Sequence, residues 1–356
     1  MKRVLFFGIF DPAYARTRVL EEGFRAQGYE VVHCRVDPRV ALGARKYRAL
    51  WKAGRLRRGE KFDQVFVLFP GHTVVWLARL LFGPRIIFDA FVSLYDSNVG
   101  DRRKYGPYAL RAWRDELLDR SSCALARVVL VDTEAHRQYF ATHLGVPSHK
   151  LLVVSVGAAS AWFAAGEQRM NASEAKAETL VVFYGSYIPL HGVSTILRAA
   201  ALLASEPIRF RLIGGGQEYA RMQALVHSLG GLSKVEFTPS LPREELIDRV
   251  HEADLCLGIF GDTEKAARVI PNKVYECAAL GKPIITTDTS AVHEAFTDRE
   301  NILLCAASSE ALAEAIRTLA RDSTLRHRVA KEARSLMLAH YTPEHIVRGL
   351  LAALPA

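Results

Sequence analysis

Residues 262–288 read DTEKAARVIPNKVYECAALGKPIITTD, and this stretch decides how the second half of the chain folds. Proline fixes φ at a value that suits a helix start, so Pro271 and Asn272 predict the beginning of a short helix, with Asn272 able to cap it. Gly281 predicts the end of that helix as a C-terminal cap. The β-branched run at 284–287 is typical of a buried parallel strand.

Two charged side chains of this predicted helix lie three positions apart. Lys273 and Glu276 share one face of the helix, and the apolar residues share another. Near a helix N-terminus, the free backbone N–H groups and the positive end of the dipole favour phosphate. The two residues form either an ordinary surface ion pair, which contributes little to stability, or a cation and a carboxylate that bind a phosphorylated ligand.

The motif Pro-Asn-Lys-x-x-Glu-x-x-Ala-x-Gly-Lys-Pro at 271–283, with an apolar strand after it, resembles the donor-site signature of the group 1 retaining glycosyltransferases (glycosyltransferase family 4). The resemblance implies the α/β GT-B architecture, in which two Rossmann-like doubly wound domains face a central cleft. It also implies that Glu276 holds the ribose hydroxyls of a nucleotide-sugar. The activity implied is retaining transfer of a sugar, of the hexosyltransferase type, to an acceptor hydroxyl in glycan, glycolipid or other glycoconjugate biosynthesis.

The chain is long enough for two domains, since it has 356 residues, of which 50% are hydrophobic. A strand, loop and helix pattern begins at residues 3–8 and again at Thr179, which predicts two similar α/β units. Between them, 164–178 loses its large apolar residues and is the predicted linker. We expect an acceptor-binding domain at 1–168 and a nucleotide-sugar-binding domain at 169–335. By resemblance, a helix in 336–356 crosses back to the first domain.

The basic residues are unevenly distributed. Residues 1–170 carry 27 Lys and Arg against 16 Asp and Glu, whereas the remaining residues carry 20 against 22. The densest basic segment is Arg39 to Lys61, where Tyr47 and Trp51 lie among the cations. A helix there suits an anionic membrane surface or a pyrophosphate-linked acceptor, although a solvated basic helix has the same pattern. No nucleic-acid-binding motif is present, so we expect no nucleic acid partner.

Localisation follows from the cysteines and the N-terminus. The five cysteines form no CxxC pair and lie in apolar surroundings, which predicts reduced core thiols rather than disulfides or metal ligands. The apolar run of residues 4–10 is too short for a secretory or membrane segment. We expect a cytoplasmic protein, peripheral at the inner face of the membrane if the basic segment binds lipid.

The loop at 185–192, GSYIPLHG, is similar to a family loop in which an Arg after the Gly and a Lys before the second Gly hold the diphosphate. Gly185 keeps its place here. Ser186 and His191 replace the two cations. His191 is alternatively a neutral capping or core residue.

The family's first acidic residue is also missing, because Arg268 stands eight positions before Glu276. A departing nucleoside diphosphate develops negative charge that a cation or dipole must stabilise. We expect Lys265, Arg268 and Lys273 to supply this charge. The alternative is that Lys265 and Arg268 are surface charges.

Further donor-site candidates follow from the same resemblance. Gly214 and Gly216 lie directly after a predicted strand, where glycine lets the backbone approach a ligand. Ser240 and Leu241 are expected near the base through main-chain groups. The complete donor-binding set is Gly185, Ser186, His191, Gly214, Gly216, Ser240, Leu241, Lys265, Arg268, Asn272, Lys273 and Glu276.

The first domain supplies the acceptor candidates. The loop after its first strand has no GxGxxG, which disfavours a nicotinamide or flavin dehydrogenase. Asp89 lies in a predicted strand at 85–97, near the sheet edge where ligands bind, and by resemblance it is catalytic together with Glu276. The residues that resemblance places beside the acceptor are Asp11, Tyr14, Arg16 and Asp96. Arg16 fits equally well as a solvent-facing helix residue.

The predicted partners are a UDP- or GDP-sugar donor and a glycan, lipid-linked or small-molecule acceptor. No DxD-like motif is evident, so we expect neither a metal ion nor another cofactor. Two alternatives remain. A nucleotide-sugar 2-epimerase uses the same fold, and the altered GSYIPLHG loop is compatible with a non-catalytic nucleotide-sugar-binding partner subunit.

Overall fold

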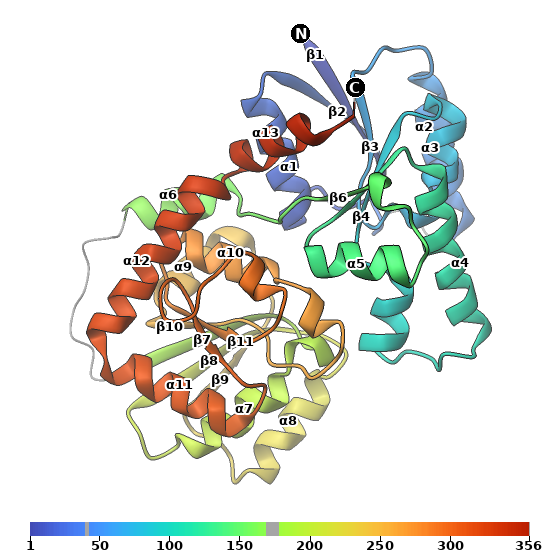
Figure 1. Ribbon diagram of the computed structural model, residues 1–356. Helices are drawn as coiled ribbons and strands as arrows, with labels where there is room; N and C mark the ends of the chain where they lie inside the picture. Colours follow the sequence, from blue (N-terminus) through green and yellow to red (C-terminus); the bar gives the residue numbers. More distant parts are fainter. Residues whose placement is uncertain (40–42, 169–177, 356) are drawn as a thin grey trace. The chain divides into compact units, whose positions relative to one another are not determined.

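The computed structural model describes residues 1–39, 43–168 and 178–355, and they form two compact α/β units (Figure 1). Unit 1 comprises Met1–Ala159 and Tyr341–Ala356, and unit 2 comprises Ser160–His340. Residues 169–177 of the predicted linker, and 40–42 of the basic segment, lie outside the described residues. The linker was predicted to start too early, because helix α6 (Ser160–Gln168) includes residues 164–168. Its buried Trp162 anchors this helix in unit 2.

Unit 1 contains a six-stranded sheet in the order β2-β1-β3-β4-β5-β6, and every neighbouring pair is parallel. Strands β2 and β3 lie on opposite sides of β1, so the topological switch point lies between β1 and β3. The strands are β1 (Lys2–Ile9), β2 (Tyr29–Val36), β3 (Gln64–Val67), β4 (Ile86–Phe91), β5 (Val128–Val131) and β6 (Leu151–Val153).

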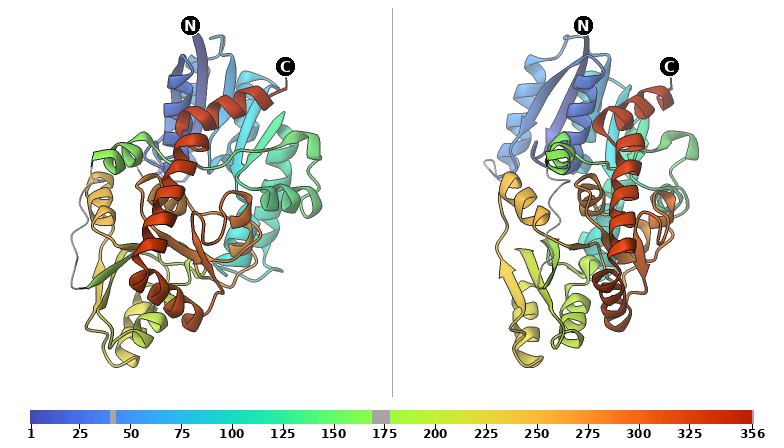
Figure 2. Two further views of the ribbon diagram at one scale, coloured as in Figure 1. Left: turned by 60° about the vertical axis from the view of Figure 1, so that its left-hand side comes forward. Right: turned by 90° about the vertical axis from the view of Figure 1, so that its left-hand side faces the viewer.

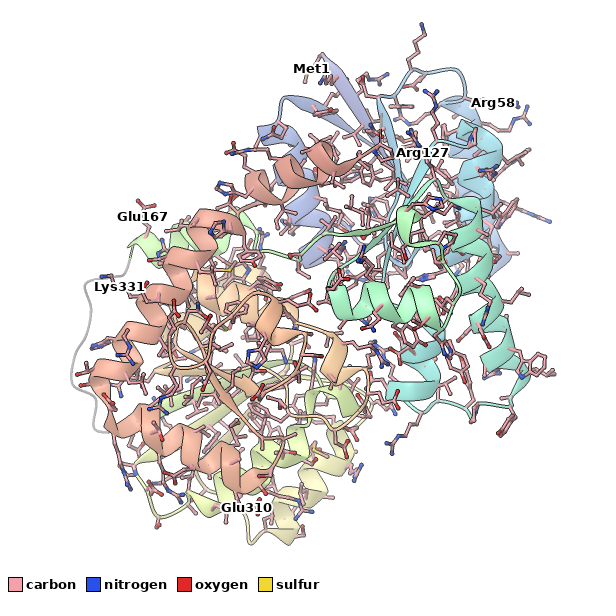
Figure 3. All side chains as sticks on the ribbon, viewed as in Figure 1. Met1, Arg58, Arg127, Glu167, Glu310 and Lys331 are labelled. Atoms are coloured by element: carbon pink, nitrogen blue, oxygen red, sulfur yellow. The ribbon has the colours of Figure 1, made fainter. Side chains whose placement is uncertain are left out.

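Helices cover both faces of this sheet. On one face, α1 (Ala15–Ala26) packs against the C-terminal helix α13 (Pro343–Ala353), as Figure 2 shows. On the other, α2 (Ala44–Leu56), α3 (Val75–Phe82) and α4 (Leu110–Leu125) pack in sequence, α2 on α3 and α3 on α4. Helix α5 (Glu134–Thr142) precedes β6. Arg127, labelled in Figure 3, donates from Nη2 to the Pro355 carbonyl oxygen at 2.9 Å and so ties down the chain end.

Two predicted strands of unit 1 are shorter in the structure. The strand predicted at 85–97 ends at Phe91, whose φ of 62° leaves the extended region, and a π-helix (Asp96–Asp101) follows. The apolar run at 151–160 also predicts a strand, but β6 ends at Val153, and Gly157 adopts a φ of 67° before α6 begins. In both segments, a left-handed residue interrupts an apolar run that periodicity alone reads as continuous strand.

Unit 2 repeats the architecture with the order β12-β11-β10-β7-β8-β9, again entirely parallel. Its switch point lies between β7 and β10. The strands are β7 (Thr179–Ser186), β8 (Ile208–Gly215), β9 (Val235–Thr238), β10 (Leu255–Leu257), β11 (Ile284–Thr287) and β12 (Leu303–Cys305). Besides α6, the helices are α7 (Val193–Leu202), α8 (Tyr219–Ser228), α9 (Arg243–His251), α10 (Asn272–Ala279), α11 (Ser309–Arg321) and α12 (Ser323–His340).

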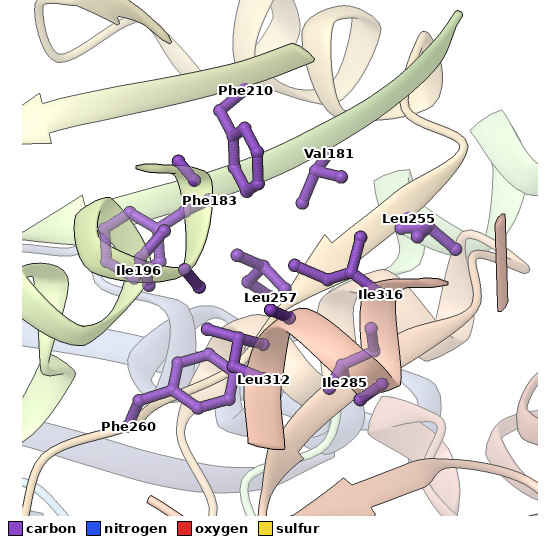
Figure 4. Packing of buried hydrophobic residues seen from close by; sticks show 14 of the residues in the cluster. Val181, Phe183, Ile196, Phe210, Leu255, Leu257, Phe260, Ile285, Leu312 and Ile316 are labelled. Carbon is purple, nitrogen blue, oxygen red and sulfur yellow. The ribbon is translucent and has the colours of Figure 1, made fainter. Parts of the chain in front are cut away.

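The core of unit 2 joins the sheet to the helices on one face. Figure 4 shows Phe183 and Leu257 from the strands packed with Ile196 of α7 and Leu312 of α11, all buried. Such a continuous apolar core fixes the sheet rigidly, so the loops at its carboxyl edge are held in place.

The stretch at 262–288 folds as its sequence predicts. Helix α10 starts at Asn272 after Pro271, Gly281 follows it with a φ of 76°, and 284–287 form the fully buried β11. One detail was wrong: Pro271 occupies the N-cap position, and no side chain caps the helix. Among the described residues, no helix combines the length and apolar character needed to cross a membrane.

Candidate functional site

The loops at the switch point of unit 2 bring several predicted donor-site residues together. Open parallel sheets bind ligands at the carboxyl ends of strands at this point. Gly185 and Ser186 end β7, and the following turn returns His191 onto them, where its Nδ1 donates to the Ser186 carbonyl oxygen. A Cβ at Gly185 would lie 3.1 Å from the His191 ring, and the φ of 140° there also favours glycine.

Glycine is required at 214 and 216 because the ends of β7 and β8 lie very close together. A Cβ at Gly214 would be 2.1 Å from the Gly185 carbonyl oxygen, and one at Gly216 would be 2.9 Å from the Tyr187 nitrogen. Both glycines have φ values that side chains rarely adopt, 134° and 145°. These two residues therefore shape the floor of the site by backbone packing.

Lys273 places a positive charge against the same loop. The residue, in the first turn of α10, is only 5% exposed, and its Nζ has no hydrogen-bond partner among the described residues. Nζ would lie 3.1 Å from a Cβ at Gly185 and is 3.9 Å from the centroid of the Phe183 ring. Burial lowers the pKa of Lys273 to about 7. Because a buried charge is costly unless it is paired, this ammonium is suited to an anionic ligand.

Glu276 is held one turn further along α10. The Tyr184 hydroxyl donates to Glu276 Oε2 at 2.6 Å, and Trp162 stacks on the Tyr184 ring with centroids 6.0 Å apart. Burial raises the pKa of Glu276, while the Tyr184 hydrogen bond and the charges of Lys273 and Arg243 counteract the rise. The carboxylate is thus fixed by a tyrosine that sequence reasoning did not select, although Tyr184 directly precedes Gly185.

Arg243 is a second residue that sequence reasoning missed. It begins α9 after Pro242, and its Nε and Nη1 are buried without a hydrogen-bond partner among the described residues. The positive charge of Arg243 lowers the pKa of Glu276. Ser240 and Leu241, which were predicted near the base, lie just before it, with Ser240 exposed and Leu241 half-buried. In the sequence, only its position just after Ser240 and Leu241 pointed to Arg243.

The three predicted replacement cations do not share one environment. Lys265 and Arg268 lie on the segment between β10 and α10, where Lys265 is 7% exposed and Arg268 Nη1 is 3.6 Å from Glu264 Oε2. Of the three, Lys273 is the one whose Nζ lies against Gly185. Asn272 is the half-buried first residue of α10.

In unit 1, Asp89 and Arg16 form a buried ion pair. Arg16 Nε is 2.7 Å from Asp89 Oδ1, and both side chains are 2% exposed. Arg16 Nη1 also donates to the Val154 carbonyl oxygen at 2.8 Å, and its guanidinium lies 4.9 Å from the centroid of the Phe91 ring. Burial raises the pKa of Asp89, and Arg16 opposes the rise. The alternative of a solvent-facing Arg16 is wrong, since 1% of the residue is exposed.

The other acceptor candidates surround the ends of β1 and β4. Asp11 accepts from the Ala13 backbone nitrogen at 2.8 Å and pairs with Arg39. The Tyr14 ring lies 6.3 Å from the Phe91 ring. Phe91 thus contacts both Tyr14 and Arg16, so these two residues and Asp89 are brought together, whereas Asp11 is engaged with Arg39.

Asp96 begins the π-helix (Asp96–Asp101), and the residues just before it are held by Asp119. The carboxylate of Asp119 accepts from Ser93 Oγ at 2.7 Å and from the Leu94 and Tyr95 backbone nitrogens at 2.9 and 3.0 Å. Burial raises the pKa of Asp119 to about 6. The backbone nitrogen of Asp96, itself 4% exposed, donates to Ser93 Oγ at 3.0 Å. The backbone at Asp96 is therefore held in place by buried polar contacts.

A second buried polar pair in unit 1, Asp132 and His136, was not predicted to be functional. Asp132 directly follows β5 and hydrogen-bonds His136 Nδ1. Its charge raises the pKa of the Asp89 carboxyl, to which burial contributes more. Asp132 Oδ2 and His136 Nε2 are buried without a hydrogen-bond partner among the described residues. Over the same residues, no group of three or more His, Cys, Asp and Glu side chains is arranged to hold a metal ion.

Two protein families match the two halves of the chain. Residues 166–336 match the family described as glycosyl transferases group 1, and residues 4–157 match the glycosyl transferase 4-like domain. No curated protein sequence is significantly similar to the chain.

Solved structures of the same fold cover nearly the whole chain. Sucrose-phosphate synthase from Thermosynechococcus elongatus is similar with a TM-score of 0.75 at 17% identity, over 99% of this chain and 100% of that one. HepE from Anabaena, in complex with UDP-glucose, has a TM-score of 0.71 at 14% identity, with 99% and 100% covered. WaaG, a glycosyltransferase involved in lipopolysaccharide biosynthesis, has a TM-score of 0.67 at 15% identity and the same coverage.

Two doubly wound α/β units, each with a parallel six-stranded sheet, define the GT-B fold. With both halves of the sequence matching, the chain belongs to the group 1 glycosyltransferases. The predictions of family and fold are confirmed. The roles of the individual site residues remain predictions.

Proposed function

We propose that unit 2 binds a nucleotide-sugar and that the enzyme transfers the sugar, with retention of configuration, to an acceptor hydroxyl. One observation carries this proposal: the buried Lys273 ammonium, which has no hydrogen-bond partner among the described residues, lies against the glycine loop at the end of β7. A diphosphate bound there would form an ion pair with the Lys273 ammonium and accept hydrogen bonds from the first backbone N–H groups of α10. As the glycosidic bond breaks, the same groups would stabilise the charge on the leaving diphosphate.

The remaining donor contacts follow from this position. Tyr184 occupies Oε2 of Glu276, so we assign Oε1 to the ribose hydroxyls. The charge of Arg243, at the start of α9, acts on this carboxylate. We place the base near Ser240 and Leu241, just before α9. The remaining proposed donor residues are Gly185, Ser186, His191, Gly214, Gly216, Lys265, Arg268 and Asn272. The nucleobase proposed is uracil or guanine, and UDP-glucose is the first probe, since HepE binds it.

We propose that unit 1 binds the acceptor. The preferred chemistry is front-face displacement, in which the leaving phosphate helps to remove the acceptor proton and Asp89 orients the hydroxyl. Burial raises the pKa of Asp89, and Arg16, bonded to it, would act as a positioning residue. Asp11, Tyr14 and Asp96 remain proposed acceptor contacts.

We also propose a hexosyl donor, a reaction without a metal ion, and a role in glycan or glycoconjugate biosynthesis in the cytoplasm. A lipid-linked acceptor would be reached through peripheral contact between the basic segment, Arg39 to Lys61, and an anionic membrane.

A thermal-shift panel of UDP-, GDP- and dTDP-sugars tests donor binding, because a ligand that binds the folded protein raises its melting temperature. Calorimetry on Lys273→Ala and Arg268→Ala then tests the cation assignment. If both variants bind the donor as tightly as the parent protein, the proposed diphosphate site is wrong.

Turnover distinguishes the alternatives. Incubation of UDP-sugar without acceptor would yield the 2-epimer if the protein is an epimerase. Binding without release of UDP or GDP, over a broad acceptor panel, would favour a non-catalytic subunit. The anomeric configuration of a product, read by NMR, tests retention.

A further inference from the structure

Large apolar side chains are exposed on one face of helix α4 in unit 1. Leu110, Trp113 and Leu117 are 90%, 69% and 66% exposed. Their spacing of three and four residues places them along a single stripe of the helix. A soluble helix normally turns such a stripe toward a core, so this face has an unusual amount of apolar surface in contact with solvent.

The stripe continues onto neighbouring elements. Helix α3 packs against α4 and exposes Trp76 and Leu80, one turn apart, to 52% and 63%. Tyr108, immediately before α4, is 92% exposed. We call these side chains the apolar ridge; its members are Trp76, Leu80, Tyr108, Leu110, Trp113 and Leu117.

Cations flank the ridge on both sides. Next to it, Arg103, Lys104 and Arg111 are exposed, while Asp101 and Asp115 are fully buried. The remaining acidic side chain of this segment, Glu116, is 33% exposed and forms an ion pair with Arg120 at 2.8 Å. The net charge that this segment presents to solvent is therefore positive.

On the other side, α2 packs against α3 and contains no acidic residue. Its exposed Arg45, Arg48, Lys52 and Arg55 recur at spacings of three and four, so they form a cationic stripe on one face. Trp51, 43% exposed, lies beside it with the Arg55 guanidinium 4.8 Å from its ring centroid.

We propose that the apolar ridge and the cationic stripe form one surface that docks on an anionic membrane. Tryptophan, tyrosine and leucine side chains beside Lys and Arg are the composition of segments that lie in the headgroup region with their apolar face in the acyl boundary. The cations attract anionic headgroups and bring the ridge to the surface. A second copy of the chain is disfavoured as the occupant, because two such cationic faces repel each other.

The basic segment alone would make only electrostatic contact with the membrane. In the surface proposed here, the apolar ridge on α3 and α4 also inserts side chains into the bilayer. It does not depend on the proposed sugar transfer, and its test needs no donor or acceptor. Binding of the full chain to phosphatidylcholine vesicles with and without phosphatidylglycerol is measured by flotation. We expect binding to the anionic vesicles only, and a residual bound fraction at high salt that arises from the ridge.

The decisive variant is Trp113→Ser with Leu117→Ser. Both residues are exposed, so folding, checked by melting temperature, is expected to be unchanged, whereas the vesicle partition constant should fall about tenfold or more. Leu338→Ser is the matched control, because Leu338 of unit 2 is 47% exposed and lies outside the ridge. The control is expected to bind as the parent does.

Fluorescence gives an independent readout. The chain has four tryptophans, and Trp162 is 1% exposed. In a Trp51→Phe, Trp76→Phe variant, a blue shift with anionic vesicles must therefore come from Trp113 entering the bilayer.

Three results would overturn the proposal. One is the absence of binding to anionic vesicles. Another is binding that the serine variant leaves unchanged. The third is a lipid-free dimer that this variant dissociates, because the occupant of the ridge would then be a second copy.

Discussion

The two units bury charge in opposite ways. In unit 1, Arg16 is enclosed with Asp89 at 2.7 Å and donates a further hydrogen bond to Val154. In unit 2, Lys273 is nearly as buried, but its Nζ has an aromatic face and no hydrogen-bond partner among the described residues. Burying a charge costs free energy that only a partner restores. The charge of Arg16 is therefore balanced within the protein, whereas the charge of Lys273 needs an anionic ligand.

The largest effect is expected from breaking the pair in unit 1. Asp89→Asn keeps the shape of the side chain but leaves the Arg16 guanidinium buried without its counter-charge. We expect the free energy of unfolding, measured in urea, to fall by about 3–5 kcal/mol. Glu116→Gln, which removes an exposed partner of Arg120 in the same unit, is the matched control and should cost less than about 1 kcal/mol.

A double-mutant cycle sharpens this prediction. Replacing both members, Arg16→Met with Asp89→Asn, should recover part of the loss, since no uncompensated charge remains. If Asp89→Asn alone is as mild as the surface control, the buried ion pair does not stabilise unit 1 as expected.

Lys273→Met should weaken ligand binding without reducing stability, unlike Asp89→Asn. The affinity for UDP-glucose, measured by calorimetry, is expected to fall about 10- to 100-fold, because a charge-assisted contact contributes about 1.5–3 kcal/mol. The free energy of unfolding should stay the same or rise, since a buried cation is removed. Lys331→Met, on the solvent side of α12 and labelled in Figure 3, is the control for loss of one positive charge.

A loss of stability in Lys273→Met without a loss of affinity would reverse the comparison. Lys273 would then support the folded state rather than bind the donor.

Local signals account for what the sequence predicted correctly. The helix at α10 and strand β11 were expected because Pro271, Gly281 and the β-branched run act within a few residues. The repeat of the strand and helix pattern at Thr179 predicted the two-sheet fold for the same reason.

The partners of the charged groups could not be predicted. Arg16 meets Asp89 across 73 residues, and Tyr184 meets Glu276 across 92. Neither pair leaves a periodicity or spacing in the sequence, since each forms only when the sheet aligns distant strand ends. For that reason Arg16 fitted a solvent-facing helix equally well, and Tyr184 was overlooked.

The pH dependence of stability offers a smaller test of the unpaired ammonium. The folded pKa of Lys273, lowered by burial to about 7, is below the ordinary value of 10.5. Between these values the unfolded chain binds more protons, so the contribution of this group to stability increases as pH rises. Relative to Lys273→Met, the wild type should gain up to about 1.4 kcal/mol per pH unit above pH 7. Urea unfolding of both proteins at pH 7 and 8 measures the difference.

Ligand binding should reverse this shift. An anion beside Nζ stabilises the charged form, so binding of UDP-glucose at pH 8 is expected to take up nearly one proton. Calorimetry in buffers of different ionisation enthalpy measures the uptake. An equal uptake by Lys273→Met would assign the proton to another group.

The smallest expected effect concerns the carboxylate beside the ammonium. Tyr184→Phe removes the hydroxyl that fixes Glu276 Oε2, and one such hydrogen bond contributes about 0.5–1.5 kcal/mol. We expect the affinity for UDP-glucose to fall about two- to tenfold while the affinity for inorganic pyrophosphate stays the same, because only the ribose contact is disturbed. Tyr187→Phe is the matched control, since its buried hydroxyl donates to the Leu212 carbonyl oxygen at 3.2 Å, away from Glu276. Equal losses for both ligands would mean that Tyr184 supports the whole loop at the end of β7 and that Glu276 is not positioned for ribose.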